Sequence, residues 1–167
     1  PNVTGSLLLL QEHYNNINNT FMRAATLKGL ALHTADDAGP VGPDAIWGWG
    51  LLNAKRAAET ITQNGSEALI QEMTLTQGQT ITMQVDSDGI NDLIASISWT
   101  DRPGVINTQL NSPTPALVND LDIRVSKDGT TYYPWRLTSA TTNSNNGDNK
   151  VDPFERVEVE NASGTYT

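Results

Sequence analysis

"PNVTGSLLLLQEHY" (residues 1–14) decides how the first half of this chain must fold. Proline suits the first turn of a helix, where its missing N–H is not needed. The residues after it are apolar on nearly every side of such a helix, above all at Leu7 to Leu10. Because a helix that is apolar all round is normally buried, this stretch predicts a helix from Val3 to about Asn15 that other elements cover.

Two more helices are expected after the asparagine-rich segment "NNINNT", which is taken to end the first one. Apolar residues recur at helical spacing over residues 21–31, and Asn19 or Thr20 can cap that helix. Asn53 can cap a short last helix over residues 54–61. The first part of the chain is therefore predicted to be helical.

At about Ile70 the hydrophobic period changes from helical to two, which is typical of half-buried strands. Turn signals with glycine separate the alternating segments, at residues 77–78, 88–89, 103–104, 128–129 and 163–164. Strands are expected over residues 71–77, 79–87, 93–100, 120–126 and 154–161. Several short strands with regular turns favour a β-sandwich or jelly roll. The prediction is therefore a helical unit over residues 1–62 and an all-β domain over residues 63–167 that lacks its last strands.

The charge is distributed unevenly between these two parts. Residues 1–58 are neutral overall, and residues 59–167 carry the whole net charge of −9, which argues against nucleic-acid binding. The longest apolar run is far shorter than the roughly 20 residues of a membrane-spanning helix. There are no cysteines, so disulfide and thiolate chemistry are excluded.

The search for catalytic groups is short because there are only two histidines. His33 precedes Asp36 and Asp37, and Ser6 could complete a triad, but Ser6 lies inside an apolar helix and not on a sharp exposed turn. Such a pairing is generic, and a structural role is the better interpretation. His13 near a helix C-terminus is likewise interpreted as structural.

One group of oxygen ligands stands out at the predicted strand ends. Asp101 follows one strand, Asn119 and Asp120 precede another, Asp122 shares a face with Asp120, and Glu155 opens a third strand. Calcium takes about 6–8 oxygen ligands, so these residues are candidates for a calcium site. A solvated acidic rim is the alternative.

Several segments resemble one family, the subtilisin-like serine proteases. In that family the nucleophile lies in Gly-Thr-Ser-Met-Ala-small-Pro, which leads into a buried helix, and "PNVTG" is similar to that proline and the start of the helix. "TLKGLALHTADDAGPVGPDAIWGWGLLNAKRAAE" (residues 26–59) is similar to the end of the catalytic domain. Three later segments resemble the C-terminal β-domain of some bacterial subtilases: "ISWTDRPG" (97–104), "ALVNDLDIRV" (116–125) and "FERVEVENASGTYT" (154–167).

The resemblance implies that this chain is the C-terminal part of a secreted, extracellular serine endopeptidase acting on peptides or proteins. The nucleophile would lie four residues before Pro1, and the catalytic Asp and His and the oxyanion-hole Asn would lie further upstream. None of the four is in this chain, so the fragment alone is expected to be inactive and to need the missing N-terminal catalytic portion as its partner.

The resemblance also implies that residues 63–167 form a jelly roll related to the P-domain of kexin-like proteases, which stabilises the protease. That β-domain is associated with calcium, which supports Asp101, Asn119, Asp120, Asp122 and Glu155 as ligands. The chain departs from the family at Pro153 and Phe154, where relatives often have Asn and a small apolar residue.

Two other functions stay open at this point. The β part could be a non-catalytic binding module for polysaccharide, a cell surface or a protein, with Tyr132, Tyr133 and Trp135 as a sugar platform. Such aromatic residues more often cover the edge of a core, and that interpretation is favoured. The third possibility is a purely structural, metal-stabilised domain.

Overall fold

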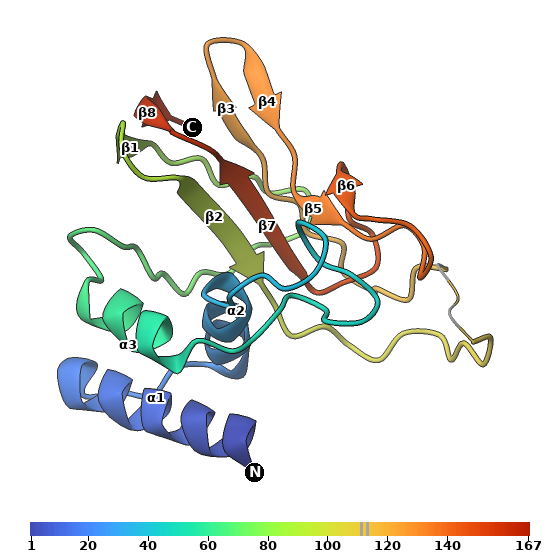
Figure 1. Cartoon of the computed structure of the whole chain (residues 1–167), viewed down its shortest axis with the longest axis horizontal. Helices are drawn as coiled ribbons and strands as arrows, with labels where there is room; N and C mark the ends of the chain where they lie inside the picture. The colour runs from blue at the N-terminus through green and yellow to red at the C-terminus, as the bar shows by residue number, and fades with distance from the viewer. Residues whose placement is uncertain (111, 113) are drawn as a thin grey trace.

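A computed structural model describes residues 1–110, 112 and 114–167. The first third of the chain contains the helices, and the rest contains short strands joined by irregular segments (Figure 1). The helices are α1 (Asn2–Asn18), α2 (Ala24–His33) and α3 (Ala54–Thr62). The strands are β1 (Val85–Asp88), β2 (Leu93–Ser98), β3 (Val125–Lys127), β4 (Thr130–Tyr132), β5 (Trp135–Arg136), β6 (Asn145–Asn146), β7 (Phe154–Val159) and β8 (Ser163–Tyr166). Within these described ranges, every helix is too short or too polar to cross a membrane.

Helix α1 confirms the first predicted helix but is longer and less buried than expected. It continues through the asparagine run to Asn18, and Asn19 ends it in the left-handed region with φ of 53°. Asparagine tolerates that conformation better than most residues. Leu10 is buried, whereas Leu8 is 70% and Leu9 is 65% exposed. The prediction of burial on every side is therefore wrong for this chain, because α1 packs along one stripe only.

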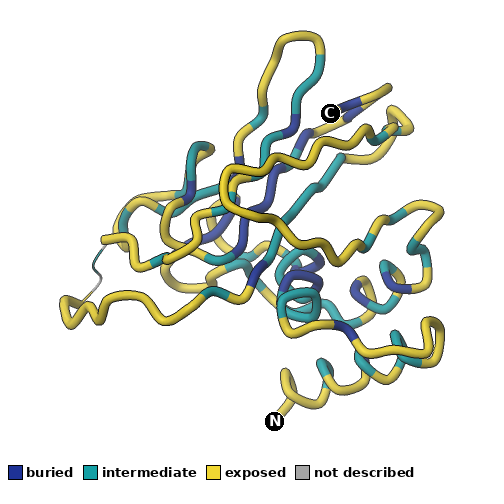
Figure 2. Tube along the Cα trace, turned by 180° about the vertical axis from the view of Figure 1, so that it is seen from behind, coloured by how far each residue is buried: buried dark blue, intermediate teal, exposed yellow. Residues whose placement is uncertain are grey.

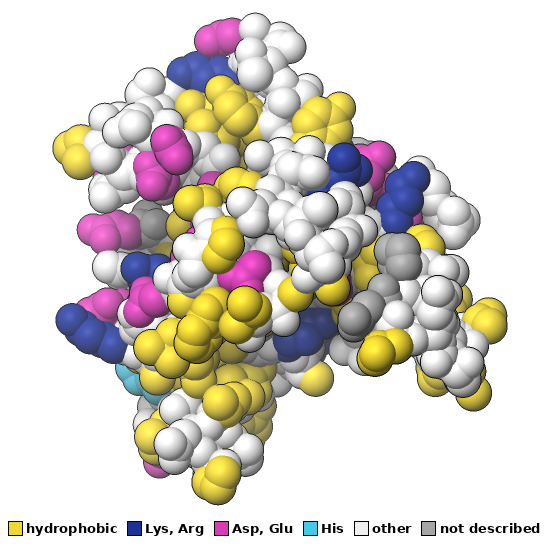
Figure 3. Space-filling view, turned by 45° about the vertical axis from the view of Figure 1, so that its right-hand side comes forward, with side chains coloured by type: hydrophobic (Ala, Val, Ile, Leu, Met, Phe, Trp, Pro, Cys, Tyr) yellow, Lys and Arg dark blue, Asp and Glu magenta, His cyan; other side chains and the backbone are white. Residues whose placement is uncertain are grey.

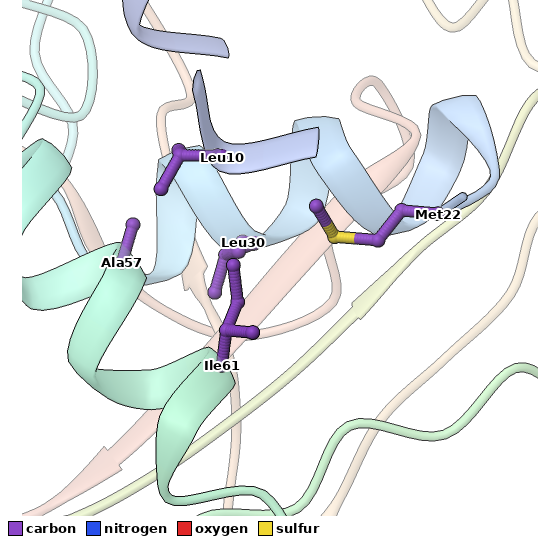
Figure 4. Packing of buried hydrophobic residues seen from close by; sticks show 5 residues of the cluster. All are labelled: Leu10, Met22, Leu30, Ala57 and Ile61. Carbon is purple, nitrogen blue, oxygen red and sulfur yellow. The ribbon is translucent and has the colours of Figure 1, made fainter. Parts of the chain in front are cut away.

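The three helices share one hydrophobic core (Figure 4). Its buried members come from all three helices and from the α1–α2 connection: Leu10, Met22, Leu30, Ala57 and Ile61. Asn53 caps α3 as predicted, since its side-chain oxygen accepts a hydrogen bond of 2.8 Å from the Arg56 N–H.

Helix α2 begins later than the sequence suggested, and its start is held by a distant residue. The N-cap position is Arg23, and the expected caps Asn19 and Thr20 lie outside the helix. Glu72 accepts hydrogen bonds from the Arg23 N–H and the Thr26 hydroxyl, at 2.8 and 2.5 Å. A carboxylate near a helix N-terminus is favourable for the helix dipole, so Glu72 compensates for the missing local cap.

The strands form four antiparallel pairs, β1–β8, β2–β7, β3–β4 and β5–β6. β2 and β7 confirm the predicted strands over residues 93–100 and 154–161. β7 has buried residues on both of its faces and is dark along most of its length in Figure 2, whereas every residue of β2 is of intermediate exposure. One face packs on the second hydrophobic core, which is formed by Val125, Val157, Val159, Ala162 and Tyr166. The other face lies toward the helices.

Other strand predictions are wrong or only partly right. Residues 71–77 form no strand, residues 79–87 contribute only the start of β1, and residues 120–126 contribute only the start of β3. In the described part of the chain the pairs stay small and do not close into a barrel. Alternation predicts which side chains could be buried, but a strand also needs a neighbouring backbone to pair with.

The turn between β3 and β4 confirms the turn predicted at residues 128–129, although β4 was not predicted. Asp128 and Gly129 both have positive φ, at 49° and 80°, as a two-residue type I′ turn requires. The expected turn at Ser163 and Gly164 is wrong, because both residues belong to β8. A turn lies instead at Glu160 and Asn161, between β7 and β8, where Asn161 has φ of 48°.

Candidate functional site

The helical half (residues 1–62) meets the β half (residues 63–167) where α2 lies against β2 and β7. We call this contact the helix–strand junction. A Cβ atom placed on Gly29 would lie only 2.7 Å from the Cβ atom of Ser98. The helix can approach the strand this closely because glycine has no side chain. The Lys28 Nζ group donates to the backbone carbonyls of Trp99 and Pro153, at 3.0 and 2.9 Å. Helix α2 is thus attached to the end of β2 and the start of β7.

A buried arginine from β7 makes the second attachment. Arg156 is 4% exposed, and its Nη1 atom donates to the Leu32 carbonyl at 3.3 Å. Its Nη2 atom is 2.8 Å from Oε1 of Glu158, and its guanidinium carbon lies 4.8 Å from the centre of the Trp49 ring. Burial lowers the pKa of Arg156, and the nearby Glu158 carboxylate opposes that change. The cation–π contact with Trp49 and the hydrogen bond to the Leu32 carbonyl therefore join β7 to the helical half, while Glu158 of the same strand supplies the counter-charge.

His33 lies in the same junction. Its Nδ1 atom is 2.8 Å from the Ser96 hydroxyl on β2. Burial is the largest cause that lowers the pKa of His33, the positive charges of Arg156 and Arg56 add to it, and together they bring the pKa to about 4. The imidazole is therefore neutral at pH 7. The sequence could not reveal this partner, because Ser96 is 63 residues away and no motif links the two.

The conceivable triad of Ser6, His33 and an aspartate is not assembled. His33 pairs with Ser96, and Asp36 pairs with Arg56 at 3.2 Å and with the Asn53 amide. The Asp37 carboxylate accepts hydrogen bonds from its own loop. The other histidine, His13, contacts the Thr62 hydroxyl at 2.9 Å and so joins α1 to α3. Each histidine therefore contacts a hydroxyl group on another element.

The candidate calcium ligands fall into two groups, and the first is Asp101 with Asn119. The Asp101 carboxylate accepts hydrogen bonds from the Val118 N–H and the Asn119 side-chain amide, both at 2.7 Å. Desolvation opposes ionisation, but these donors outweigh it and lower the pKa of Asp101. In this arrangement the Asp101 carboxylate closes the base of the loop between β2 and β3.

The second group gathers around Arg124. Its Nη2 atom bonds to Asp122 at 2.9 Å and to the Asp148 carboxylate, and its Nη1 atom is 3.8 Å from Oε2 of Glu155. Burial raises the pKa of Asp120, and the negative charge of Asp122 raises it further. The sequence indicated the carboxylates but missed Arg124, whose guanidinium is the cation that they share in this structure.

Glu155 is the most confined member of this group. Its side chain is fully buried, and its Oε2 atom accepts a hydrogen bond of 2.8 Å from the Ile123 N–H. Among the described residues no donor makes a hydrogen bond of good geometry to its other oxygen, Oε1. Burial and then the negative charge of Asp122 raise the pKa of Glu155, the Ile123 N–H, Arg124 and the Asn149 backbone N–H oppose the rise, and the resulting pKa is about 7. A buried carboxyl group with an unused oxygen is costly unless it is protonated or gains a partner.

The described ranges contain no group of three or more His, Cys, Asp or Glu side chains placed to hold a metal ion. The fit to calcium is therefore partial: the donor chemistry and the unused Glu155 oxygen suit a hard cation, whereas Arg124 already contacts Asp122 and Glu155.

Two of the three candidate sugar-binding aromatics are packed into the fold. Tyr132 lies edge-on against Tyr166 at 6.2 Å, and the Trp135 indole N–H donates to Glu158 at 2.8 Å. Tyr133 is 43% exposed and has the Arg124 guanidinium 4.8 Å from its ring centre. Beside these rings is an open cleft of about 210 Å³, lined by Thr131, Tyr132, Tyr133, Asn146 and Glu158. The contacts favour a core-edge role for Tyr132 and Trp135.

Comparison with known proteins gives one partial match. No family model matches the chain. Over 63 residues it is 36% identical to serotype-specific antigen 1 of Mannheimia haemolytica. The matched region is 38% of this chain and 6% of that protein, so the chain is similar to a small part of a much longer relative.

Proposed function

We propose that this chain is the C-terminal portion of a secreted subtilisin-like serine endopeptidase. Residues 1–62 would complete its α/β catalytic domain, and residues 63–167 would form a P-domain-like jelly roll that stabilises it. The observation that carries the proposal is the order of the resembling segments, which runs from "PNVTG" through "GWGLLNA" to "FERVEVEN" along nearly the whole chain. The resemblance is to the family, and the partial match to an antigen neither adds to it nor opposes it.

The helix–strand junction supports the stabilising role of the β part. Lys28 and Trp49 belong to the segment that resembles the end of a catalytic domain, and they contact Pro153 and Arg156 of the β part. The Trp49 ring also meets Phe154 edge-on at 5.0 Å. Loss of the β part would therefore expose Trp49 and the side of α2 that packs against β2 and β7.

The open side of α1 supports an upstream catalytic portion as partner. Leu8 and Leu9 project from a helix whose other stripe is packed, and large apolar side chains gathered on a surface often mark an interface. In the proposed protease, the upstream sheet and nucleophile turn would cover them. Acyl transfer would use the upstream Ser, His and Asp, and the residues of this chain would position the helix that follows the nucleophile.

An extracellular location is part of the proposal and follows from the family resemblance.

The decisive observation is the coding sequence immediately upstream of Pro1. A Gly-Thr-Ser-Met-Ala run is expected there, with its Ser four residues before Pro1. The longer protein should then be labelled by a serine-directed phosphonate at that Ser and should hydrolyse peptides, whereas residues 1–167 alone should do neither. Labelling of Ser96 or Ser6 in the isolated chain, or a different upstream sequence, would overturn the proposal.

Polysaccharide binding tests the rival function, a non-catalytic binding module. The 210 Å³ cleft beside the exposed Tyr133 ring is the feature that favours a binding module. If the upstream run is absent and insoluble polysaccharide retains the chain, but not a Tyr133→Ala variant, the binding module replaces the protease.

Calcium is the cation proposed for the β part, with Asp101, Asn119, Asp120, Asp122 and Glu155 as candidate ligands. Clustered carboxylates repel one another without a counter-charge, and the unused Oε1 atom of Glu155 is the feature that a cation would satisfy. These residues would supply hard oxygen ligands near three strand ends.

Thermal melting tests this assignment. Calcium that binds only the folded chain at a hundredfold excess over Kd adds about 2.7 kcal/mol of stability, which moves Tm by several degrees. The wild type should gain this shift in calcium and lose it in chelator, and magnesium should give less because it demands a compact octahedral site.

Asp120→Ala and Asp122→Ala should each lose most of the calcium shift, whereas Glu160→Ala, which removes an exposed acid elsewhere, should keep it. An unchanged wild-type melt in chelator, or a full shift in both aspartate variants, means that the named ligands are wrong.

A further inference from the structure

In the helix–strand junction, His33 lies beside two residues that are paired across β2 and β7. Ser96 of β2 and Arg156 of β7 occupy directly opposite positions in the antiparallel register, so both side chains leave the same face of the pair. His33, the last residue of α2, contacts Ser96 at 2.8 Å. The Arg156 guanidinium donates to the carbonyl of Leu32, the residue before it.

The charged groups around His33 come from four elements. α2 itself carries Lys28, which is bound to two backbone carbonyls. β7 carries Arg156 with its partner Glu158. α3 carries Arg56, and the connection after α2 carries Asp36 and Asp37.

The nearby carboxylates are already engaged. Glu158 bonds to Arg156 and to the Trp135 indole, and Asp36 bonds to Arg56 and Asn53. Asp37 accepts the N–H groups of Ala38 and Gly42. A proton that enters His33 would therefore place a half-buried positive charge near two arginines whose counter-ions are in use.

We propose that the helix–strand junction is a pH-sensitive contact, which stays closed while His33 is neutral and opens in acid when His33 is protonated. The helical half and the β half would then separate along the α2–β2 contact while each keeps its own hydrophobic core. This holds whichever function the chain serves, because it rests on the geometry of the junction alone.

The direction of the effect follows from linkage. The pKa of His33 is lowered from an ordinary value of 6.5 to about 4 in the closed junction. The open form therefore binds protons more readily between these two values. The stability that neutral His33 gives the closed junction is complete above pH 6.5, falls as the pH drops, and is lost below about pH 4. Between pH 7 and pH 4 the equilibrium constant for opening should rise on the order of a hundredfold.

A single introduced thiol can report the opening, since the chain has no cysteine. The Ser98 hydroxyl is buried beneath Gly29, so the thiol of a Ser98→Cys variant reacts only when α2 lifts from β2. The rate at which this thiol reacts with a pyridyl disulfide reagent that works in acid is measured. It is divided by the reaction rate of a Ser66→Cys variant, whose thiol lies at an exposed position, to correct for the pH dependence of the reagent. This ratio should rise on the order of a hundredfold from pH 7 to pH 4.

His33→Gln, combined with Ser98→Cys, should make the ratio nearly independent of pH, because glutamine can still bond to Ser96 but cannot become charged. His13→Gln is the matched control and should behave as wild type. If Ser98→Cys does not fold, amide hydrogen exchange of residues 24–33 in the wild type and in His33→Gln at the same pH gives the same comparison. A flat wild-type ratio, or an equal acid response in His33→Gln, would overturn the proposal.

Discussion

At the scale of single residues, Glu155 shows how burial can reverse the usual behaviour of an acid. Its carboxyl group is fully buried on the β7 face opposite Arg156, with one oxygen bonded to the Ile123 N–H and the other unused. Burial raises its pKa to about 7 from an ordinary 4.5. The folded chain therefore binds a proton that the unfolded chain has released between pH 4.5 and 7, so this residue stabilises the fold below pH 4.5 and loses that effect as the pH rises through 7.

Glu155→Gln, measured in chelator, should remove this pH dependence. The wild type should lose roughly 2–3 kcal/mol of unfolding free energy between about pH 4.5 and pH 8 through this group, whereas the glutamine variant should stay level through the same interval. Denaturant unfolding at several pH values gives the comparison. Equal slopes in the two proteins would show that Glu155 ionises freely in the folded state.

At the scale of elements, the contact between α2 and β2 depends on two residues with different tasks. Gly29 permits the close approach to Ser98, and Lys28 ties the helix to two backbone carbonyls at the strand ends. Burial lowers the pKa of Lys28, and the charge of Asp152 opposes that change. The packing distance and the attachment are thus supplied by neighbouring positions on one turn of α2.

Gly29→Ala should destabilise the chain by about 1–3 kcal/mol, because the added methyl group overlaps the Ser98 side chain. Gly5→Ala in α1 is the matched control: its Cβ would meet nothing within 4 Å, and alanine is the better helix former by up to about 1 kcal/mol. Urea unfolding should show opposite signs for the two. A neutral Gly29→Ala would mean that α2 can move away from β2 without cost.

At the scale of the whole molecule, the two hydrophobic cores lie on opposite sides of the β2–β7 pair, and α1 is the helix farthest from the strands (Figure 1). Figure 3 shows hydrophobic side chains gathered over the helical end of the molecule. Val3, Leu8 and Leu9 contribute large exposed apolar surfaces there. A surface of this kind favours association.

Residues 1–167 should therefore self-associate at high concentration, and Leu8→Gln with Leu9→Gln should reduce that association without lowering Tm, because both side chains are already in water. Sedimentation velocity over a concentration series measures the change. Glu12→Gln on the same helix is the control for altered charge. A wild-type monomer at every concentration would argue against a covering partner for α1.

The sequence by itself determined the division into a helical part and a strand part, because helical and twofold periods are local properties of neighbouring residues. It also determined the Asn53 cap, the Asp128-Gly129 turn and the two long strands, each of which rests on residues a few positions apart. Only the tertiary structure decided that residues 71–77 stay unpaired, that Leu8 and Leu9 are exposed, and that His33 meets Ser96. It likewise decided that Arg124 lies among the candidate calcium ligands. These outcomes depend on contacts between residues that are far apart in the sequence, and no local sequence pattern specifies such contacts.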